Sequence, residues 1–566
     1  MAVESSPTER GQIHSELISY ENRAGRRITA YLDAAVRDLT GVQFVLMAPK
    51  YGETKKNNLQ LAYYLVANGF AVLRFDFTNH VGESEGAMED FTMPGAVDDI
   101  VAGLDFLERR FEADSVVVVA SSLSGRCALR AAAQDPRIER LICLVGVVNL
   151  QRTILEMYQE DVFGLYLEGR VYGPTSFLGF VTNGASFLGT AVETNLHALD
   201  GAIRDMEAIE IPVTYFCAER DLWVDGADVQ RVFGGRGNCR LVPIEGAMHE
   251  LRENIRAAET AYRSTVLACL GRLGDTPEPA VVVPDKRVVL AQNKRERDRL
   301  RQILPENVVE SEFWTRYLSR YAALERAGAY RDYVHTVGTL LGEFTPGCRV
   351  LDAGCGNGHF GIWLWLRTLQ EERPRAAQPE VYVGVDLTAG GLRDSIRRHS
   401  GLVLEREAPE AAPPPDRALQ FTYLQFDFDR IEPTDGQSVL PFADATFDKV
   451  CCSLVISYLK APERLLAELY RVLRPGGVLV LSSMKPYCDL SSLYRDYVVH
   501  EAGKDDLEWA RGMLHAAGQL KLKEEKGSYT FFLAQELEDL ARSAGFHSPE
   551  AHSTFGNQTN VVRVVK

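Results

Sequence analysis

The first half of the chain carries a serine in the setting that a nucleophile requires. An apolar run at Val116–Ala120, typical of a buried strand, leads into the sequence SSLSG at 121–125. A nucleophilic serine on a strained strand-to-helix turn needs small residues two positions before and two positions after it. Ala120 and Ser124 meet this condition around Ser122, although a strict GxSxG motif has glycine at both places. We therefore predict Ser122 as the nucleophile, with Ser124 as the alternative whose flanking residues fit the turn less well.

An acid and a histidine follow in the order that this chemistry expects. The strand-like IPVTYFCAERD at 211–221 ends in Asp221, and LVPIEGAMH at 241–249 delivers His249 through a loop that contains glycine. Serine, acid and histidine in this chain order are typical of α/β-hydrolases. We predict that His249 takes the proton of the serine and that Asp221 holds the imidazole tautomer and stabilises its charge.

A hydrolase of this kind also needs N–H donors for the oxyanion. The residue after the nucleophile supplies one of them, which points to the backbone N–H of Leu123 at the start of the predicted helix. The second donor should come from the loop after the strand Phe44–Ala48, near Lys50 or Tyr51.

Four stretches of this half resemble one family. They are NGFAVLRFDFTNHVGESEG (68–86), SSLSGR (121–126), LVGVVNL (144–150) and ERDLWV (219–224), and they resemble the fatty acyl transferase/thioesterase of the bacterial bioluminescence operon. The resemblance covers about residues 10–270 and implies an α/β-hydrolase that cleaves acyl chains from acyl carrier protein through an acyl-serine. It fades over 151–205, where the acyl pocket and cap should lie. It therefore implies an acyl thioester or ester substrate without giving the chain length.

A glycine-rich turn in the second half has the features of a cofactor cradle. The sequence RVLDAGCGNGHF at 349–360 predicts a strand, a turn and the start of a helix. Gly354, Gly356 and Gly358 let the backbone approach a ligand closely, and a helix N-terminus favours a carboxylate. Dinucleotide enzymes share this pattern, but Asp352 before the glycines suits the cationic methionine part of S-adenosyl-L-methionine.

Two later strand ends support the same cofactor. VYVGVD at 381–386 ends in Asp386, whose carboxylate can accept hydrogen bonds from both ribose hydroxyls. YLQFDF at 423–428 places Asp427 and Phe428 where the amino group and the face of adenine could be held. Taken singly, each acid can also be a plain carboxylate at a strand end.

The whole series, continued by LPFADATFDKV (440–450) and ELYRVLRPGGVLVL (468–481), resembles class I S-adenosylmethionine-dependent methyltransferases from about 330 to 566. The resemblance implies a Rossmann-like sheet of seven strands, mostly parallel with one antiparallel strand. Leu537–Phe546 and Thr554–Lys566 fit its last helix and terminal hairpin.

The methyl acceptor is less defined by the sequence. Its pocket should draw on the helices at 311–335 and on the insertion 484–530, with MKPY at 484–487 beyond a strand end. A carboxylate acceptor needs no general base, whereas a phenol, alcohol or carbon acid does. His359 is a candidate base, although a histidine beginning a helix without a catalytic role is the simpler interpretation.

These side chains require two α/β domains to position them. Strand-like runs at Phe44–Ala48, Ala71–Phe75, Val116–Ala120, Leu141–Val145, Val213–Ala218 and Cys239–Pro243 alternate with helical stretches, which predicts a parallel sheet flanked by helices. The alternation restarts at Arg349 and continues at Val381–Val385, Phe421–Phe426, Lys449–Ser453 and Val478–Ser482. We predict an α/β-hydrolase domain at 1–270, a linker at 271–300 that contains the proline-rich GRLGDTPEPAVVVP (271–284), and a methyltransferase domain at 301–566. Glu405–Arg417 reads as a surface loop.

The amino-acid composition limits the kinds of binding partner that we expect. The 62 basic and 78 acidic residues give a formal net charge of −16, which argues against nucleic acid as a general partner. No apolar run reaches the length of a membrane span, and the N-terminus lacks the pattern of a signal peptide, so we expect a cytoplasmic protein. The ten cysteines show no zinc spacing; we expect free thiols and no metal.

The leading hypothesis is a bifunctional enzyme of secondary or lipid metabolism. Its first half would cleave an acyl thioester or ester, and its second half would methylate the same intermediate, with carboxylate O-methylation as one version. Two alternatives stay open: a first half that only binds or presents an acyl carrier protein, and acyl transfer or cyclisation in place of hydrolysis. The expected partners are a small-molecule or acyl-thioester substrate and an acyl carrier protein.

Overall fold

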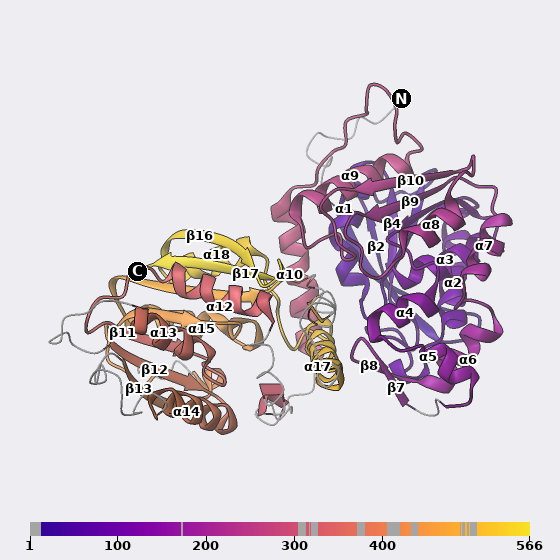
Figure 1. Ribbon diagram of the computed structural model, residues 1–566. Coiled ribbons are helices and arrows are strands. Elements are labelled where there is room, and N and C mark those ends of the chain that lie inside the picture. Colours follow the sequence, from indigo (N-terminus) through magenta and orange to yellow (C-terminus); the bar gives the residue numbers. More distant parts are fainter. Residues whose placement is uncertain are drawn as a thin grey trace, which may run out of the picture. The chain divides into compact units, whose positions relative to one another are not determined.

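The computed structural model describes residues 13–170, 174–303, 313–315, 317–318, 327–370, 380–404, 419–431, 440–486, 488, 493–494, 497 and 507–566. The chain forms two compact units. The first comprises residues 1–304 together with 517–527, and the second comprises 305–516 together with 528–566. Each unit is built on its own central sheet (Figure 1).

The sheet of the first unit has the strand order β1-β2-β4-β3-β5-β6-β9-β10 within the described residues. The strands are β1 His14–Glu21, β2 Arg27–Ala34, β3 Phe44–Ala48, β4 Ala71–Phe75, β5 Val116–Ser121, β6 Ile138–Leu144, β9 Val213–Ala218 and β10 Cys239–Ile244. From β4 to β10 neighbouring strands run parallel, while β2 is antiparallel to both β1 and β4. The predicted parallel core is confirmed, and the antiparallel strands β1 and β2 extend it beyond the sequence prediction.

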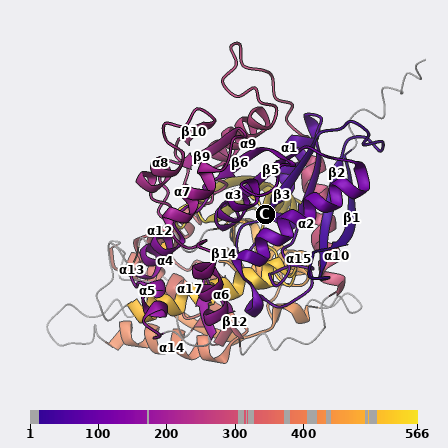
Figure 2. The same cartoon turned by 90° about the vertical axis from the view of Figure 1, so that its right-hand side faces the viewer.

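Helices cover both faces of this sheet. They are α1 Leu59–Ala67, α2 Met93–Phe111, α3 Leu123–Ala132, α7 Leu199–Glu207, α8 Gly226–Phe233 and α9 Ile255–Cys269. Alternate valines of β5 point to opposite faces: Val117 and Val119 join a core with α1 and α9. Figure 2 shows α2 and α3 on the near side of the strands. The consecutive β-branched residues of β5 are therefore buried on both sides, as a central parallel strand requires.

A smaller group of elements follows β6. It consists of α4 Leu150–Tyr158, α5 Val162–Leu167, β7 Pro174–Phe177, β8 Phe180–Asn183 and α6 Gly184–Glu193. β7 and β8 form a separate antiparallel hairpin, so this group stands outside the main sheet. We call the residues 150–193 the cap; they occupy most of the segment 151–205 in which the sequence predicts a cap.

One further helix belongs to the first unit. Residues 286–303 form α10 (Lys286–Ile303), which starts inside the segment 271–300 expected to be a linker. Its Glu296 is buried and binds the guanidinium of Arg74 at 2.6 Å, and Arg74 also binds Asp33 of β2 at 2.5 Å. A fully buried arginine needs such paired carboxylates, which explains why this helix packs against the sheet of the first unit.

The second unit holds a sheet of order β13-β12-β11-β14-β15-β17-β16. The strands are β11 Arg349–Ala353, β12 Glu380–Asp386, β13 Leu419–Gln425, β14 Phe447–Cys452, β15 Leu473–Met484, β16 His547–Thr554 and β17 Thr559–Val565. β17 is antiparallel to both of its neighbours, and the other described pairs are parallel. The predicted seven-stranded sheet with one antiparallel strand is confirmed.

Helices flank this sheet as well. They are α12 Gly328–Leu340, α13 His359–Gln370, α14 Ala389–Leu404, α15 Pro462–Val472 and α18 Ala534–Ser543. The beginning of α17 (Leu507–Glu525) also belongs to this unit. Val350 joins a core with α12 and α13, while the next residue, Leu351, joins one with α15 and α18. The predicted surface loop Glu405–Arg417 lies outside the described residues, and so does Tyr487.

Candidate active sites

Ser122 sits on a sharp turn between β5 and α3. Its backbone has φ 54° and ψ −126°, a conformation that is strained for a residue with a side chain. The turn is tight because α3 approaches the strand ends closely: a Cβ on Gly125 would lie 2.8 Å from the Cα of Gly146. Ala120 is completely buried beneath it. The small residues predicted around Ser122 are therefore needed for packing.

The hydroxyl of Ser124, the alternative nucleophile, is engaged in hydrogen bonds with the backbone. Its hydroxyl accepts a hydrogen bond from the N–H of Ser121 at 3.0 Å and donates to the carbonyl of Ser121 at 2.8 Å. It is buried, with 2% of its surface exposed. The geometry therefore favours Ser122 as the reactive hydroxyl.

The three predicted catalytic side chains meet at the carboxyl ends of β5, β9 and β10. Ser122 Oγ lies 2.8 Å from His249 Nε2, and His249 Nδ1 lies 3.0 Å from a carboxylate oxygen of Asp221. Asp221 also accepts the N–H groups of Trp223 and Val224. Burial would raise the pKa of Asp221, but His249 and these N–H groups outweigh it and the pKa is lowered. Asp221 is thus held as a carboxylate facing the imidazole.

The loop after β3 lies against the loop that carries His249. The ammonium of Lys50 donates to the carbonyl of His249 at 3.2 Å and binds the carboxylate of Glu250 at 2.9 Å. Leu123 is the first residue of α3, so its N–H has no acceptor within the helix. The Lys50 side chain therefore fixes the two loops together, while the N–H groups of Leu123 and of the Lys50–Tyr51 loop stay the predicted oxyanion donors.

A histidine that the sequence interpretation left without a role supports this loop. His80 Nε2 accepts the N–H of Gly52 at 3.0 Å. Burial lowers the pKa of His80 to about 3, so the ring is neutral and its nitrogen is free of the proton that would prevent it from accepting. His80 lies within the 68–86 stretch that carries the family resemblance, and this was the available signal.

Aromatic rings connect the Lys50–Tyr51 loop with the cap. The ring of Tyr51 lies 5.7 Å from that of Phe180 in the hairpin and 5.5 Å from that of Phe91. Phe187 of α6 lies 6.2 Å from Phe91 and 5.0 Å from Phe177. These five rings form one apolar cluster between the Lys50–Tyr51 loop and the cap, a composition that suits an acyl group.

In the second unit, the glycine turn follows β11 as predicted. Gly354, Gly356 and Gly358 have φ values of 87°, 51° and 87°, which side chains rarely adopt. A Cβ on Gly354 would lie 1.9 Å from a methyl group of Val455. Glycine is thus required here by conformation and, at Gly354, by space.

The predicted ribose ligand supports the turn directly. Asp386, at the end of β12, accepts the N–H of Gly356 at 2.8 Å and both the N–H and the hydroxyl of Thr388. Asp427 accepts the N–H of Asp429 and pairs with Arg430, while the ring of Phe428 is buried in the core. The structure thus places Asp386 at the glycine turn; the adenine contacts of Asp427 and Phe428 stay predictions.

The residues present fit S-adenosyl-L-methionine. Asp352 accepts the hydroxyl of Tyr382 on one carboxylate oxygen and has the thiol of Cys451 as a further, weak donor. Its buried Oδ1 accepts no N–H or O–H group among the described residues. Burial raises the pKa of Asp352 to about 7. A cationic ligand at this strand end would satisfy the oxygen and favour the charged form of Asp352.

Aromatic residues gather near this turn. Trp314 lies with its ring 4.5 Å from that of Tyr458 and 5.9 Å from that of Tyr529. Leu318, one helical turn after Trp314, would contact a Cβ on Gly356 at 3.3 Å. His359, the candidate base, is half-buried, and its ring lies 5.2 Å from that of Tyr330. The regions 311–335 and 484–530, predicted to form the acceptor pocket, thus supply aromatic side chains near the cofactor cradle.

Comparisons with known proteins agree with this division. Residues 42–276 match the family model described as acyl transferase, and residues 311–548 match that of a methyltransferase domain. The acyl transferase of Photobacterium phosphoreum is 28% identical over 228 residues, 40% of this chain and 74% of the relative. That of Shewanella hanedai is 29% identical over 246 residues, 43% of this chain and 78% of the relative.

Among solved structures, the first half is similar to Est1E from Butyrivibrio proteoclasticus with bound ferulic acid. The two chains are 19% identical, with a TM-score of 0.39, and the match covers 45% of this chain and 99% of the other. The first half of the chain is thus similar to acyl transferases, and the second half is similar to a methyltransferase domain. These similarities support a bifunctional enzyme, and the methyltransferase match implies the use of S-adenosyl-L-methionine.

Three further observations concern the described part of the chain. Its ten cysteines are free thiols. In the described residues, no helix combines the length and apolar character that a membrane crossing needs, and no cluster of metal-binding side chains is found.

Proposed function

We propose that the first half cleaves an acyl thioester or ester through an acyl-Ser122 intermediate and that the second half methylates the same pathway intermediate. The observation that carries the proposal is the 2.8 Å contact between Ser122 Oγ and His249 Nε2, continued to Asp221 at 3.0 Å. A nucleophile, a base and an orienting acid within hydrogen-bond distance are the requirements for acyl transfer.

The proposed steps follow from this geometry. His249 Nε2 takes the proton as Ser122 Oγ attacks the acyl carbonyl, and the N–H of Leu123 with the Lys50–Tyr51 loop stabilises the oxyanion. The leaving thiol or alcohol departs with the proton from His249. Water, activated by the same nitrogen, then attacks the acyl-serine, which releases a carboxylic acid and restores the hydroxyl of Ser122.

The aromatic side chains of the cap support the proposal that the acyl group is apolar. Phe177, Phe180 and Phe187 lie in or beside the hairpin, next to Tyr51 of the Lys50–Tyr51 loop. The relatives are named acyl transferases, which supports acyl substrates, and an acyl carrier protein is a candidate partner. We place the reaction in the cytoplasm, where the ten free thiols would stay reduced.

A carboxylate is the acceptor that this chain's residues suit best. When bound, S-adenosyl-L-methionine supplies an electrophilic methyl group, and the protein holds the acceptor in line with it. Burial lowers the pKa of His359 to about 4, which makes it a weak base for an alcohol or carbon acid. A carboxylate arrives as an anion and needs no base, and the proposed hydrolysis releases one.

Labelling with a fluorophosphonate probe tests the first half. The full chain should become labelled at Ser122, and Ser122→Ala should lose both labelling and thioester hydrolysis while Ser124→Ala keeps them. Absence of labelling in a folded wild-type chain would instead favour the alternative in which this half only presents an acyl carrier protein.

Product analysis tests the second half. Incubation with an acyl thioester and methyl-labelled S-adenosyl-L-methionine should give a labelled methyl ester, and Ser122→Ala should form it only from the supplied free acid. Label on another atom would refute carboxylate methylation. Transfer of the acyl group to an alcohol or its cyclisation, without free acid, would support the acyl-transfer alternative.

A further inference from the structure

Part of the first unit comes from far along the chain. Residues 517–527, the end of α17 and the turn after it, pack with residues 1–304. In sequence, this segment lies inside the stretch 311–548 that matches the methyltransferase model. The hydrolase unit therefore contains eleven residues that no continuous domain boundary would assign to it. We call residues 517–527 the inserted segment.

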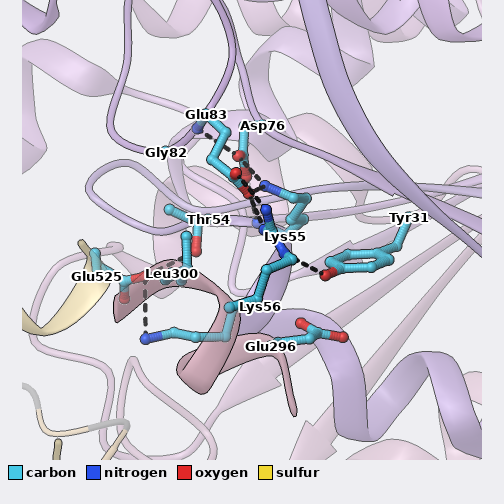
Figure 3. Close-up of a pocket in the computed structure, with 11 residues that line it drawn as sticks. Tyr31, Thr54, Lys55, Lys56, Asp76, Gly82, Glu83, Glu296, Leu300 and Glu525 are labelled. Carbon is cyan, nitrogen blue, oxygen red and sulfur yellow. Dashed lines mark hydrogen bonds and ion pairs between the residues drawn. The ribbon is translucent and has the colours of Figure 1, made fainter. Parts of the chain in front are cut away.

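Acidic residues of the inserted segment bind the region after β3. Glu525, 1% exposed, accepts hydrogen bonds from the hydroxyl of Thr54 and the amide of Asn57, both at 2.8 Å. Glu524 binds the ammonium of Lys56 at 2.7 Å. Figure 3 shows Glu525 beside Thr54 and Lys56. These contacts surround η1 (Lys55–Asn58), which directly follows the Lys50–Tyr51 loop.

A chain of ion pairs runs from the same segment to the loop that carries the triad histidine. Lys521 lies 3.6 Å from Glu53, and Arg252 lies 2.5 Å from the same carboxylate. Arg252 also binds Glu250, the residue next to His249. Opposite charges in this buried region are paired, so removal of one leaves its neighbour buried without compensation.

The inserted segment also contacts the cap. Gln519 donates from its amide to the carbonyl of Gly179 in the hairpin turn at 2.8 Å. Gly518 allows the close approach, because a Cβ there would lie 2.2 Å from the carbonyl oxygen of Leu178. The adjacent Phe180 packs onto Gly52, where an added Cβ would lie 2.5 Å from its ring. The same eleven residues therefore touch both the cap hairpin and the loop region 50–58.

We propose that the inserted segment positions the hydrolase site. Lys521, Glu525 and Gln519 act as positioning residues that hold the region 50–58 and the hairpin turn in the arrangement needed for oxyanion binding and acyl binding. This inference rests on the proposed function, since the loop and the cap matter only if Ser122 reacts. Acyl cleavage in the first half is then dependent on residues from the second half of the sequence.

Matched substitutions in the full chain test the role of Lys521. Lys521→Met should lower kcat for p-nitrophenyl ester hydrolysis by about ten-fold or more, with a smaller change in KM, because the oxyanion is a feature of the transition state. Lys521→Arg should restore most of the rate. Lys526→Met changes the same residue type at an exposed position of the segment and should stay near wild type.

Glu525 and Gln519 give two further readouts. Glu525→Leu should lower the rate constant for Ser122 labelling by the fluorophosphonate, whereas Glu525→Gln keeps an acceptor for Asn57 and should retain most of it. Gln519→Ala should raise KM for long-chain esters more than for acetyl esters. Equal rates for Lys521→Met, Glu525→Leu and wild type would overturn the inference, as would loss of rate only in parallel with the fraction of folded protein.

Hydrogen exchange separates this inference from the proposed function. Lys521→Met should speed amide exchange in residues 50–58 relative to Lys526→Met, whether or not the wild type reacts with the probe. A wild type without labelling refutes the proposed hydrolase activity, and unchanged exchange at 50–58 refutes the positioning role.

Discussion

The two sites differ in what the chain itself provides. In the first unit the proposed reacting groups are side chains already in contact, with Ser122 Oγ 2.8 Å from His249 Nε2. In the second, Asp386 is engaged with the N–H of Gly356 and with Thr388, and its carboxylate shapes a turn. The proposed hydrolase site thus consists of side chains that are already in contact, and the proposed cofactor site consists of a backbone cradle whose chemistry would come from the bound cofactor. The comparison predicts that substitutions will affect the two activities independently.

The largest effect should come from the base of the triad. His249→Ala removes the proposed acceptor of the serine proton, and hydrolysis of a p-nitrophenyl ester should fall by about 10⁴-fold or more. Binding of S-adenosyl-L-methionine, measured by calorimetry on the same sample, should match wild type. A residual rate within ten-fold of wild type would mean that another group activates Ser122.

The reciprocal substitution is Asp386→Ala. It removes the acceptor for the Gly356 N–H and the predicted ribose contact, so affinity for S-adenosyl-L-methionine should fall by about 10- to 100-fold. Fluorophosphonate labelling of Ser122 serves as the control and should be unchanged. Simultaneous loss of labelling would contradict the independence of the two sites.

A smaller effect should appear in the pH dependence of cofactor binding. Burial raises the pKa of Asp352 to about 7, so the free protein binds a proton there below neutral pH. A cationic ligand favours the carboxylate, and affinity should therefore rise with pH from 6 towards 7.5, by at most ten-fold per pH unit. Asp352→Asn should flatten this profile, measured by calorimetry in matched buffers; an unchanged slope would assign it to another group.

The smallest effect is expected at Ser124. Ser124→Ala removes the acceptor for the N–H of Ser121 and should reduce the free energy of unfolding by about 1–3 kcal/mol, measured by urea denaturation. Ester hydrolysis should remain within a few-fold of wild type. A loss comparable to that of His249→Ala would return Ser124 to consideration as the nucleophile.

Sequence reasoning succeeded where local pattern and function coincide. The apolar run before Ser122 predicted β5, and the glycine spacing predicted the turn after β11. It missed β2, whose buried Asp33 is compatible with a strand only because Arg74 of β4 pairs with it. Such long-range ion pairs leave no periodic signal in the sequence.

The same limit applies to the site. The triad follows from chain order and small-residue spacing, since these are local requirements. The role of His80 depends on the N–H of Gly52, 28 positions away, and that of Glu525 on Thr54 and Asn57. No property of these residues alone predicts such partners.

Because residues 517–527 belong to the first unit, a cleaved chain should behave differently from two separate domains. Because the chain passes three times from one compact unit to the other, a single proteolytic nick between residues 304 and 327 would leave fragments that still share one folded body. Such fragments should co-elute and separate only under denaturing conditions, and the isolated N-terminal fragment should expose the charged surface around η1.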